Sequence, residues 1–189
     1  MAEKVDNKSL WNEAAKVGIV FGLFSSVCLV LKEASALTGS TLLVKIAAAV
    51  LWAVEFFGCI LLMKKYMLDL MEKYSGLTYR QLYLFGSHIG LLSGLILAAV
   101  DAFIITKIPQ ETVAQVMDEL ASGMGGLGAS GTQQMEQEVM DYLPAFTFFG
   151  QWLYCYMYGT FLSAILSRYI FLSKVRDDIN NDIDNQQQQ

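Results

Sequence analysis

Charged residues, histidine and proline are all scarce in this chain. Aspartate, glutamate, lysine and arginine make up 16% of the 189 residues, whereas a soluble domain carries about 25%. His88 is the one histidine, and the three cysteines are far apart, with neither a redox-pair nor a zinc-site spacing. A metal site, or a nucleophile beside a base, therefore has almost nothing to build from. We expect no metal, no cofactor and no enzyme activity.

A basic surface is missing as well. The formal net charge is −5, and most of the acidic residues fall in one loop and in the C-terminal tail. Nucleic-acid binding relies on clustered lysine and arginine side chains that neutralise phosphates. The sequence therefore excludes nucleic acid as a partner.

Long apolar runs are what the chain has in abundance. Hydrophobic residues make up 54% of it, and they are gathered into blocks instead of being spread at an amphipathic period. About 20 such residues cross a bilayer core, and four blocks are long enough. We expect a single membrane domain over residues 1–189, an all-α bundle of four transmembrane helices with spans at 11–32, 45–67, 81–106 and 144–172.

Lysine and arginine are distributed unevenly between the two sides of these spans. Of the 13 basic residues, only Lys32, Lys45 and Lys107 fall in the connections after spans one and three. The others lie before span one or near its start, around the connection between spans two and three, or near the end of span four and after it. Because basic residues stay on the cytoplasmic side, we expect both termini in the cytoplasm.

The connection between spans three and four, residues 107–143, is then extracytoplasmic. Apolar residues recur at helical spacing on both sides of the glycine-rich stretch 123–131. We expect an amphipathic helical hairpin there, whose second helix ends before Pro144. The tail, residues 177–189, is polar and low in complexity, and we expect it to be disordered.

Small residues form ridges on three of the expected helices, including Gly159, Ser163 and Ser167 on span four. Span three carries Gly86, Gly90 and Gly94, and span one carries Gly18 and Gly22. Within lipid, such ridges let helix backbones approach closely. They predict a tightly packed bundle, with self-association through one ridge as the alternative.

Glu55 is the one charged residue between Ile46 and Met63. A carboxylate near the middle of a span costs roughly 3 kcal/mol on insertion scales, so it must be protonated, paired or exposed to internal water. No charge on its own helix is close enough to pair with it. Other spans offer, as candidate partners at similar depth, Ser25, Ser26, His88, Gln151, Tyr154 and Tyr158. Both a functional and a structural role stay open.

Span three adds two ionisable side chains, His88 and Asp101. At 100° per residue, Asp101 falls within about 20° of the glycine ridge and near the outer end of the helix, while His88 lies roughly opposite. They cannot pair with each other on a straight helix. With Glu55 and Gln151 they make up the candidate intramembrane polar site.

Three stretches resemble a known family. They are "SLWNEAAKVGIVFG", "YSGLTYRQLYLFG" and "IITKIPQETVAQVMDEL". With the proline, the glycine-bearing apolar run and the basic end of span four, they resemble the bacterial membrane family called domain of unknown function 4199, typical of Bacteroidota. The resemblance covers roughly residues 9–176 and implies four spans in the inner (cytoplasmic) membrane. It brings no assigned activity and no catalytic residues.

Two classes of function follow from these features. The first is a non-enzymatic accessory or scaffold protein of the envelope, which acts through other membrane proteins and the lipid bilayer. The second is a small transporter or channel that uses Glu55 as an intramembrane proton or cation site. The aromatic residues of span four leave a further interpretation open, a groove for a lipid or prenyl chain.

Overall fold

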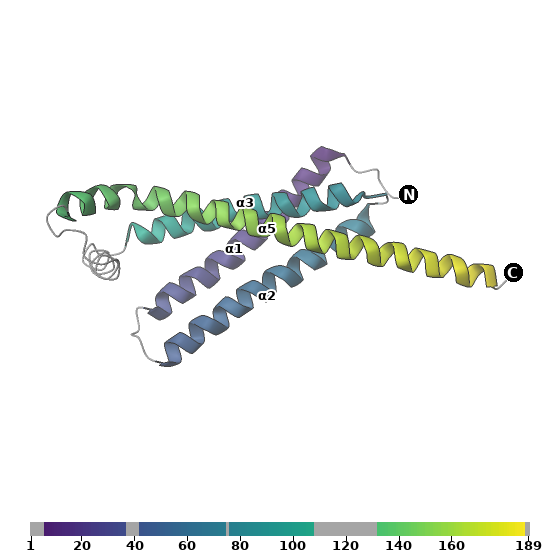
Figure 1. Ribbon diagram of the computed structural model, residues 1–189, viewed down its shortest axis with the longest axis horizontal. Helices are drawn as coiled ribbons and strands as arrows, with labels where there is room; N and C mark the ends of the chain where they lie inside the picture. The colour runs from purple at the N-terminus through teal and green to yellow at the C-terminus, as the bar shows by residue number, and fades with distance from the viewer. Residues whose placement is uncertain (1–5, 37–41, 75, 108–131, 188–189) are drawn as a thin grey trace.

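The computed structural model describes residues 6–36, 42–74, 76–107 and 132–187. These residues form four helices and no strand: α1 (Asn7–Ala36), α2 (Leu42–Lys73), α3 (Tyr79–Ile105) and α5 (Thr132–Gln187) (Figure 1). Three stretches, Asn7–Ser35, Val44–Lys73 and Tyr79–Ile105, are long and apolar enough to cross a membrane. The expected all-helical architecture is therefore confirmed, as are three helices of membrane-spanning character.

The fourth expected span, residues 144–172, lies inside α5 but is not one of those three. Its tyrosines, together with Gln151 and Arg168, make it less apolar than the leucine- and valine-rich stretches of the other helices. In the structure this part of α5 packs along α3 (Figure 1). The two helices share the largest helix–helix contact of the described chain.

Two expectations about the ends of α5 are wrong. Instead of a separate helix that ends before Pro144, one helix runs from Thr132 through Pro144 to Gln187. Proline removes one backbone donor, but helices in membrane proteins tolerate it where neighbouring groups satisfy the freed carbonyl. The expected disordered tail is helical as far as Gln187, because extending an existing helix needs no new nucleus. Residues 108–131, which include the first helix of the expected hairpin, lie outside the described residues.

The connection between α2 and α3 is short and specifically built. Gly76 has a φ of +78°, a backbone conformation that glycine adopts without strain. Thr78 then caps α3: its hydroxyl accepts from the Gln81 backbone at 3.3 Å, and the Gln81 side chain accepts from the Thr78 backbone at 3.0 Å. The turn therefore sets where α3 begins relative to α2.

The buried core lies at the end of the molecule where α2 connects to α3, which we call the closed end. It draws on the first half of α1, the second half of α2, the first half of α3 and the middle of α5. Its members are Leu10, Ala14, Val17, Phe21, Met63, Met67, Leu70, Met71, Tyr74, Leu77, Leu82, Phe85, Ile89, Leu162, Leu166 and Ile170. Polar contacts add to it, since Glu13 accepts from Lys73 at 2.8 Å and the Ser9 and Tyr74 hydroxyls lie 2.8 Å apart.

The opposite end, where α1 connects to α2, is the open end. Here the α1–α2 pair diverges from the α3–α5 pair (Figure 1). Only 6% of the most apolar stretch of α2 is buried, against 44% for α1. Most of α2 therefore faces outward and is free to meet lipid or another molecule.

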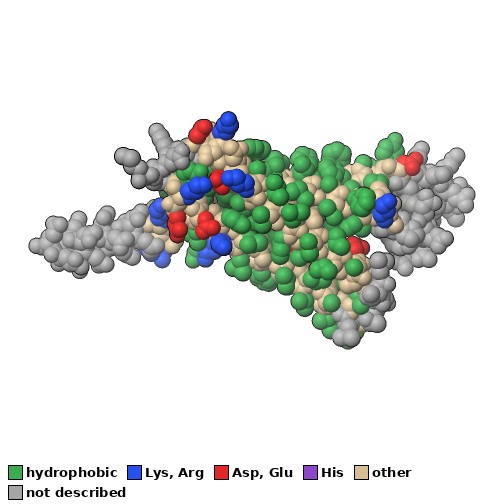
Figure 2. All heavy atoms as spheres, turned by 180° about the vertical axis from the view of Figure 1, so that it is seen from behind, with side chains coloured by type: hydrophobic (Ala, Val, Ile, Leu, Met, Phe, Trp, Pro, Cys, Tyr) green, Lys and Arg blue, Asp and Glu red, His purple; other side chains and the backbone are tan. Residues whose placement is uncertain are grey.

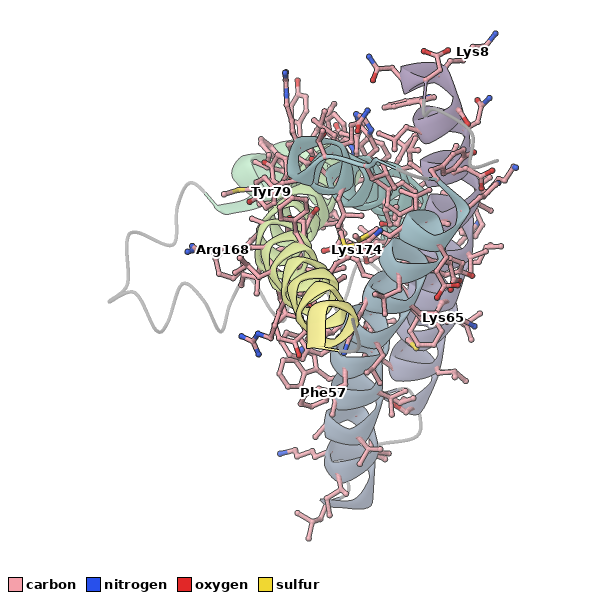
Figure 3. The ribbon with its side chains drawn as sticks, turned by 90° about the vertical axis from the view of Figure 1, so that its right-hand side faces the viewer. Lys8, Phe57, Lys65, Tyr79, Arg168 and Lys174 are labelled. Carbon is pink, nitrogen blue, oxygen red and sulfur yellow. The ribbon has the colours of Figure 1, made fainter. Side chains whose placement is uncertain are left out.

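Basic side chains gather at the closed end, beside a broad band of hydrophobic side chains (Figure 2). Arg168 projects from α5 away from the other helices, and Lys8 lies at the end of α1 (Figure 3). The exposed basic residues of this end are Lys8, Lys16, Lys65, Lys73, Arg80, Arg168, Lys174 and Arg176. This distribution matches an apolar slab with a charged rim on one side.

Candidate functional site

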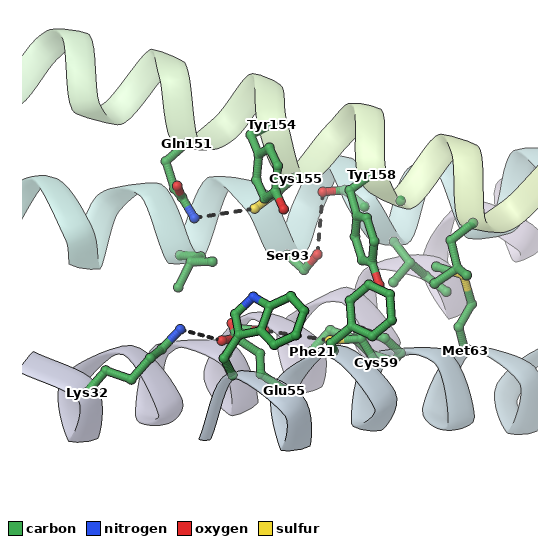
Figure 4. A pocket seen from close by; sticks show the side chains of 18 residues that line it. Phe21, Lys32, Glu55, Cys59, Met63, Ser93, Gln151, Tyr154, Cys155 and Tyr158 are labelled. Atoms are coloured by element: carbon green, nitrogen blue, oxygen red, sulfur yellow. Dashed lines mark hydrogen bonds and ion pairs between the residues drawn. The ribbon is translucent and has the colours of Figure 1, made fainter. Parts of the chain in front are cut away.

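A pocket with a volume of about 180 Å³ lies between the two diverging helix pairs. All four helices contribute to its lining (Figure 4). The core residues Phe21, Met63 and Leu162 form the floor of the pocket, on the side of the closed end. The walls extend from there toward the open end. The pocket exists because α2 turns away from α3 and α5 above that floor.

One wall of the pocket carries an ion pair between Lys32 of α1 and Glu55 of α2. The Lys32 Nζ donates to the Glu55 Oε2 at 2.7 Å, and the two side chains are 26% and 19% exposed. Glu55 was expected to find its partner among serines, tyrosines, His88 or Gln151. That expectation is wrong, because a lysine that we assigned to the outer connection reaches it instead.

The helix register explains why Lys32 was missed. Ser25 of α1 lies opposite Cys59 of α2, with oxygen and sulfur 3.9 Å apart. Continuing this antiparallel register brings Lys32 within about one helical turn of Glu55. A lysine stem bridges that distance easily. Lys32 is also four residues, or roughly 6 Å, from the end of α1, whereas Glu55 lies near the middle of α2, so the long lysine side chain reaches the carboxylate from the open end of the helix bundle.

The opposite wall belongs to α5 and presents two polar side chains, Gln151 and Tyr158, whose hydrogen-bonding groups are weakly bonded or have no partner among the described residues. The Gln151 amide donates to the Cys155 Sγ over 3.8 Å, which is a weak contact. The Tyr158 hydroxyl is buried and has no hydrogen-bond partner among the described residues. Because an unsatisfied buried hydroxyl costs about 1–3 kcal/mol, its place in the pocket indicates room for a further hydrogen-bonding group.

Aromatic rings connect the two walls at the mouth of the pocket. Trp52 stacks on Phe56 with centroids 5.5 Å apart, and Phe56 meets Tyr158 at 5.8 Å across the α2–α5 gap. Tyr158 in turn stacks with Tyr154 at 6.4 Å. Trp52 and Tyr154 are 58% and 64% exposed. The mouth is thus an aromatic frame that opens sideways between α2 and α5.

The structure divides the four residues of the predicted polar site. Glu55 and Gln151 line the pocket, on opposite walls, but His88 and Asp101 do not. His88 packs edge-on against Trp11 with ring centroids 4.3 Å apart, and its Nδ1 has no partner within the described chain. Asp101 is half-buried on α3, within electrostatic range of Lys32 and Glu33 at the end of α1.

The glycine ridge of α3 is used inside the molecule. An added Cβ at Gly90 would lie 2.9 Å from the Gly159 Cα, and one at Gly94 would lie 2.8 Å from the Cys155 Cβ, both on α5. A Cβ at Gly86 would collide with the Ser163 side chain.

The two glycines of α1 face the other side of α3. Added Cβ atoms at Gly18 and Gly22 would lie 2.9 Å and 2.8 Å from the Cβ atoms of Leu92 and Ile96. Helix α3 is therefore held between α1 and α5, and its glycine ridge is covered by α5. The backbones approach this closely only where no side chain intervenes.

Metal ligands do not cluster in the described helices: no group of three or more His, Cys, Asp and Glu side chains there could hold an ion. Cys28, Cys59 and Cys155 are free thiols. A scan against protein-family models found no match for the chain, and searches of curated proteins and of solved structures found none either. The site must therefore be interpreted from its own chemistry.

Proposed function

We propose that this chain is a non-enzymatic accessory protein of a bacterial inner membrane, and that it acts by holding another membrane component at the pocket between α2 and α5. The observation that carries the proposal is the sideways-opening pocket, which combines a Lys32–Glu55 ion pair with an aromatic mouth. Pockets of this kind, apolar with a few convergent polar groups, are typical ligand sites. The resemblance to the family of unknown function 4199 belongs to the same proposal.

The proposal includes four spans, the fourth within α5, and both termini in the cytoplasm. The basic residues of the closed end support this orientation, because that end contains the α1 N-terminus and the α2–α3 connection. The closed end then faces the cytoplasm and the pocket lies between the closed-end core and the outer side. The helix that begins at Thr132 would enter the membrane from the outer side.

Site-specific photocrosslinking tests whether the pocket holds a defined component. A photoreactive residue at Trp52, at the mouth, should give a discrete adduct in native membranes. The same residue at Ile19, which is 51% exposed on α1 and does not line the pocket, serves as the control and should give none. A diffuse, identical pattern from both positions would contradict the proposal.

A small transporter that uses Glu55 is the second candidate. One observation favours it, since Glu55 and Gln151 face each other across a cavity and not across a closed interface. The Lys32 ammonium opposes it, because it already neutralises the carboxylate. Glu55→Gln should abolish proton or cation flux in proteoliposomes, with Glu33→Gln as the control. Equal flux in both variants would exclude this role for Glu55.

A further inference from the structure

We infer that the pocket binds the headgroup of a zwitterionic aminophospholipid, with the lipid amine on Glu55 and the lipid phosphate on Lys32. This inference rests on the proposed function and names the component that the pocket holds. In the empty pocket the two side chains neutralise each other at 2.7 Å. When a headgroup that carries both charges binds, the Lys32–Glu55 ion pair is replaced by two others, one between Glu55 and the amine and one between Lys32 and the phosphate. No charge is left unpaired.

Charge balance favours a zwitterion over a singly charged lipid. The pocket holds one carboxylate and one ammonium group, so it has no net charge. An anionic headgroup that bound Lys32 would leave Glu55 without a partner in a region of low dielectric, where an unpaired charge is costly. A phosphate and an amine that enter together leave neither protein group unpaired.

The other polar groups of the pocket suit a primary amine. The Tyr158 hydroxyl has no partner in the described structure, and the Gln151 amide makes only a weak contact to Cys155. Both lie opposite Glu55 (Figure 4). The aromatic faces of Trp52, Phe56 and Tyr154 border the same space and attract primary and quaternary ammonium groups alike, so the hydrogen-bonding groups are what select a primary amine. An ammonium group with several hydrogens satisfies the carboxylate and the hydroxyl at once, which a quaternary amine cannot do.

The volume of the pocket limits what enters it. A volume of about 180 Å³ is below the ~300–1,000 Å³ of sites that enclose drug-sized ligands. A headgroup fits, but acyl chains do not. The mouth between α2 and α5 leads to exposed apolar side chains such as Leu153 of α5, which is 56% exposed. The chains of a bound lipid therefore lie along the outside of the bundle.

Lipid competition on the purified full chain tests the inference. Native mass spectrometry after exchange with phosphatidylethanolamine, phosphatidylglycerol and phosphatidylcholine of matched acyl chains measures relative retention. We expect phosphatidylethanolamine to be retained about tenfold better than the other two lipids. Its primary amine makes about one charge-assisted hydrogen bond to the pocket that neither of the others can make. The double variant Lys32→Met/Glu55→Gln leaves no unpaired charge and should lose this preference, whereas Glu33→Gln, beside the pocket, should keep it.

A second pair of variants tests the pocket in case the double variant does not fold. Phe56→Leu, at the mouth, should reduce the preference severalfold, and Phe57→Leu, on the adjacent outward face, should leave it unchanged. Equal retention of the three lipids by the wild type, or an unchanged preference in the double variant, would overturn the inference. So would displacement of the lipid by water-soluble phosphoethanolamine at equal concentration, which would identify a soluble ligand. A protein adduct from the Trp52 crosslinker would overturn the lipid assignment while the proposed function survives, and the absence of any adduct would overturn both.

Discussion

The closed end and the open end of this molecule are built from the same four helices but differ in what fills the space between them. At the closed end, Phe85 and Met67 are 1% and 0% exposed, and the helices meet through a continuous apolar core. Toward the open end, the space beyond Phe21 and Met63 holds an ion pair, a cavity and the Tyr158 hydroxyl, which has no hydrogen-bond partner among the described residues. In lipid there is little hydrophobic drive to bring helices together, so they stay together where they pack closely. The closed end has such packing and supplies the stable contact. The open end does not, and is left available for binding.

The largest effect should come from the helix contact that both ends share. Gly90→Leu would place a branched side chain where a Cβ alone already lies 2.9 Å from the Gly159 Cα. Because the nearest atoms, the Gly159 Cα and the Cys155 carbonyl oxygen, belong to the backbone, α3 and α5 must separate, and we expect loss of the folded protein on size-exclusion chromatography. Gly150→Leu is the control, since no atom lies within 4 Å of its added Cβ. Normal folding of the Gly90 variant would disprove the close α3–α5 packing.

A cavity in the closed-end core should destabilise the protein strongly. Phe85→Ala removes a side chain that is 1% exposed, and we expect a loss of about 3 kcal/mol in the free energy of unfolding, the lower range for such truncations. Phe57→Ala, on the outward face of α2 and 59% exposed, should change it by less than about 1 kcal/mol. Thermal or denaturant unfolding in detergent measures both. Equal losses would remove the distinction between the two ends.

Breaking the ion pair from one side should cost less than a core cavity, because both partners are partly exposed. Lys32→Met leaves Glu55 without a partner, and we expect a loss of about 1–2 kcal/mol in unfolding free energy. Adding Glu55→Gln removes the unpaired charge and should restore most of that loss. The non-additivity of the two changes, measured as a double-mutant cycle, reports the contact directly. Additive losses would show that the two side chains do not interact.

The smallest effects should come from two tyrosine hydroxyls, one at each end. Tyr74→Phe removes a hydroxyl that lies 2.8 Å from the Ser9 hydroxyl, so a loss of about 1 kcal/mol is expected. Tyr158→Phe removes a hydroxyl with no partner in the described chain, and should leave stability unchanged or slightly higher. If Tyr158→Phe destabilises the empty protein as much as Tyr74→Phe does, the Tyr158 hydroxyl already has a partner.

Much of the helical architecture could be predicted from local pattern, whereas most of the site could not. The runs of apolar residues located α1, α2 and α3, and intervals of four placed Gly86, Gly90 and Gly94 on one face. The continuous helix through Pro144 was missed, because proline at that position reads locally as a helix boundary. Of the pocket lining, Glu55 and its candidate partners Ser25, Gln151, Tyr154 and Tyr158 were named from the sequence, while Lys32, Trp52 and Phe56 were not.

The sequence by itself determined that the chain is helical and apolar, because both properties depend on residues that are neighbours along one helix. It also determined which faces carry glycine. Only the tertiary structure decided that Lys32 pairs with Glu55 and that α2 diverges from α5. These depend on how far one helix is shifted along another and on where helices part. An apolar helix surface can face lipid or another helix at similar cost. The hydrophobic pattern alone therefore specifies neither the shift of one helix along another nor the point where two helices diverge.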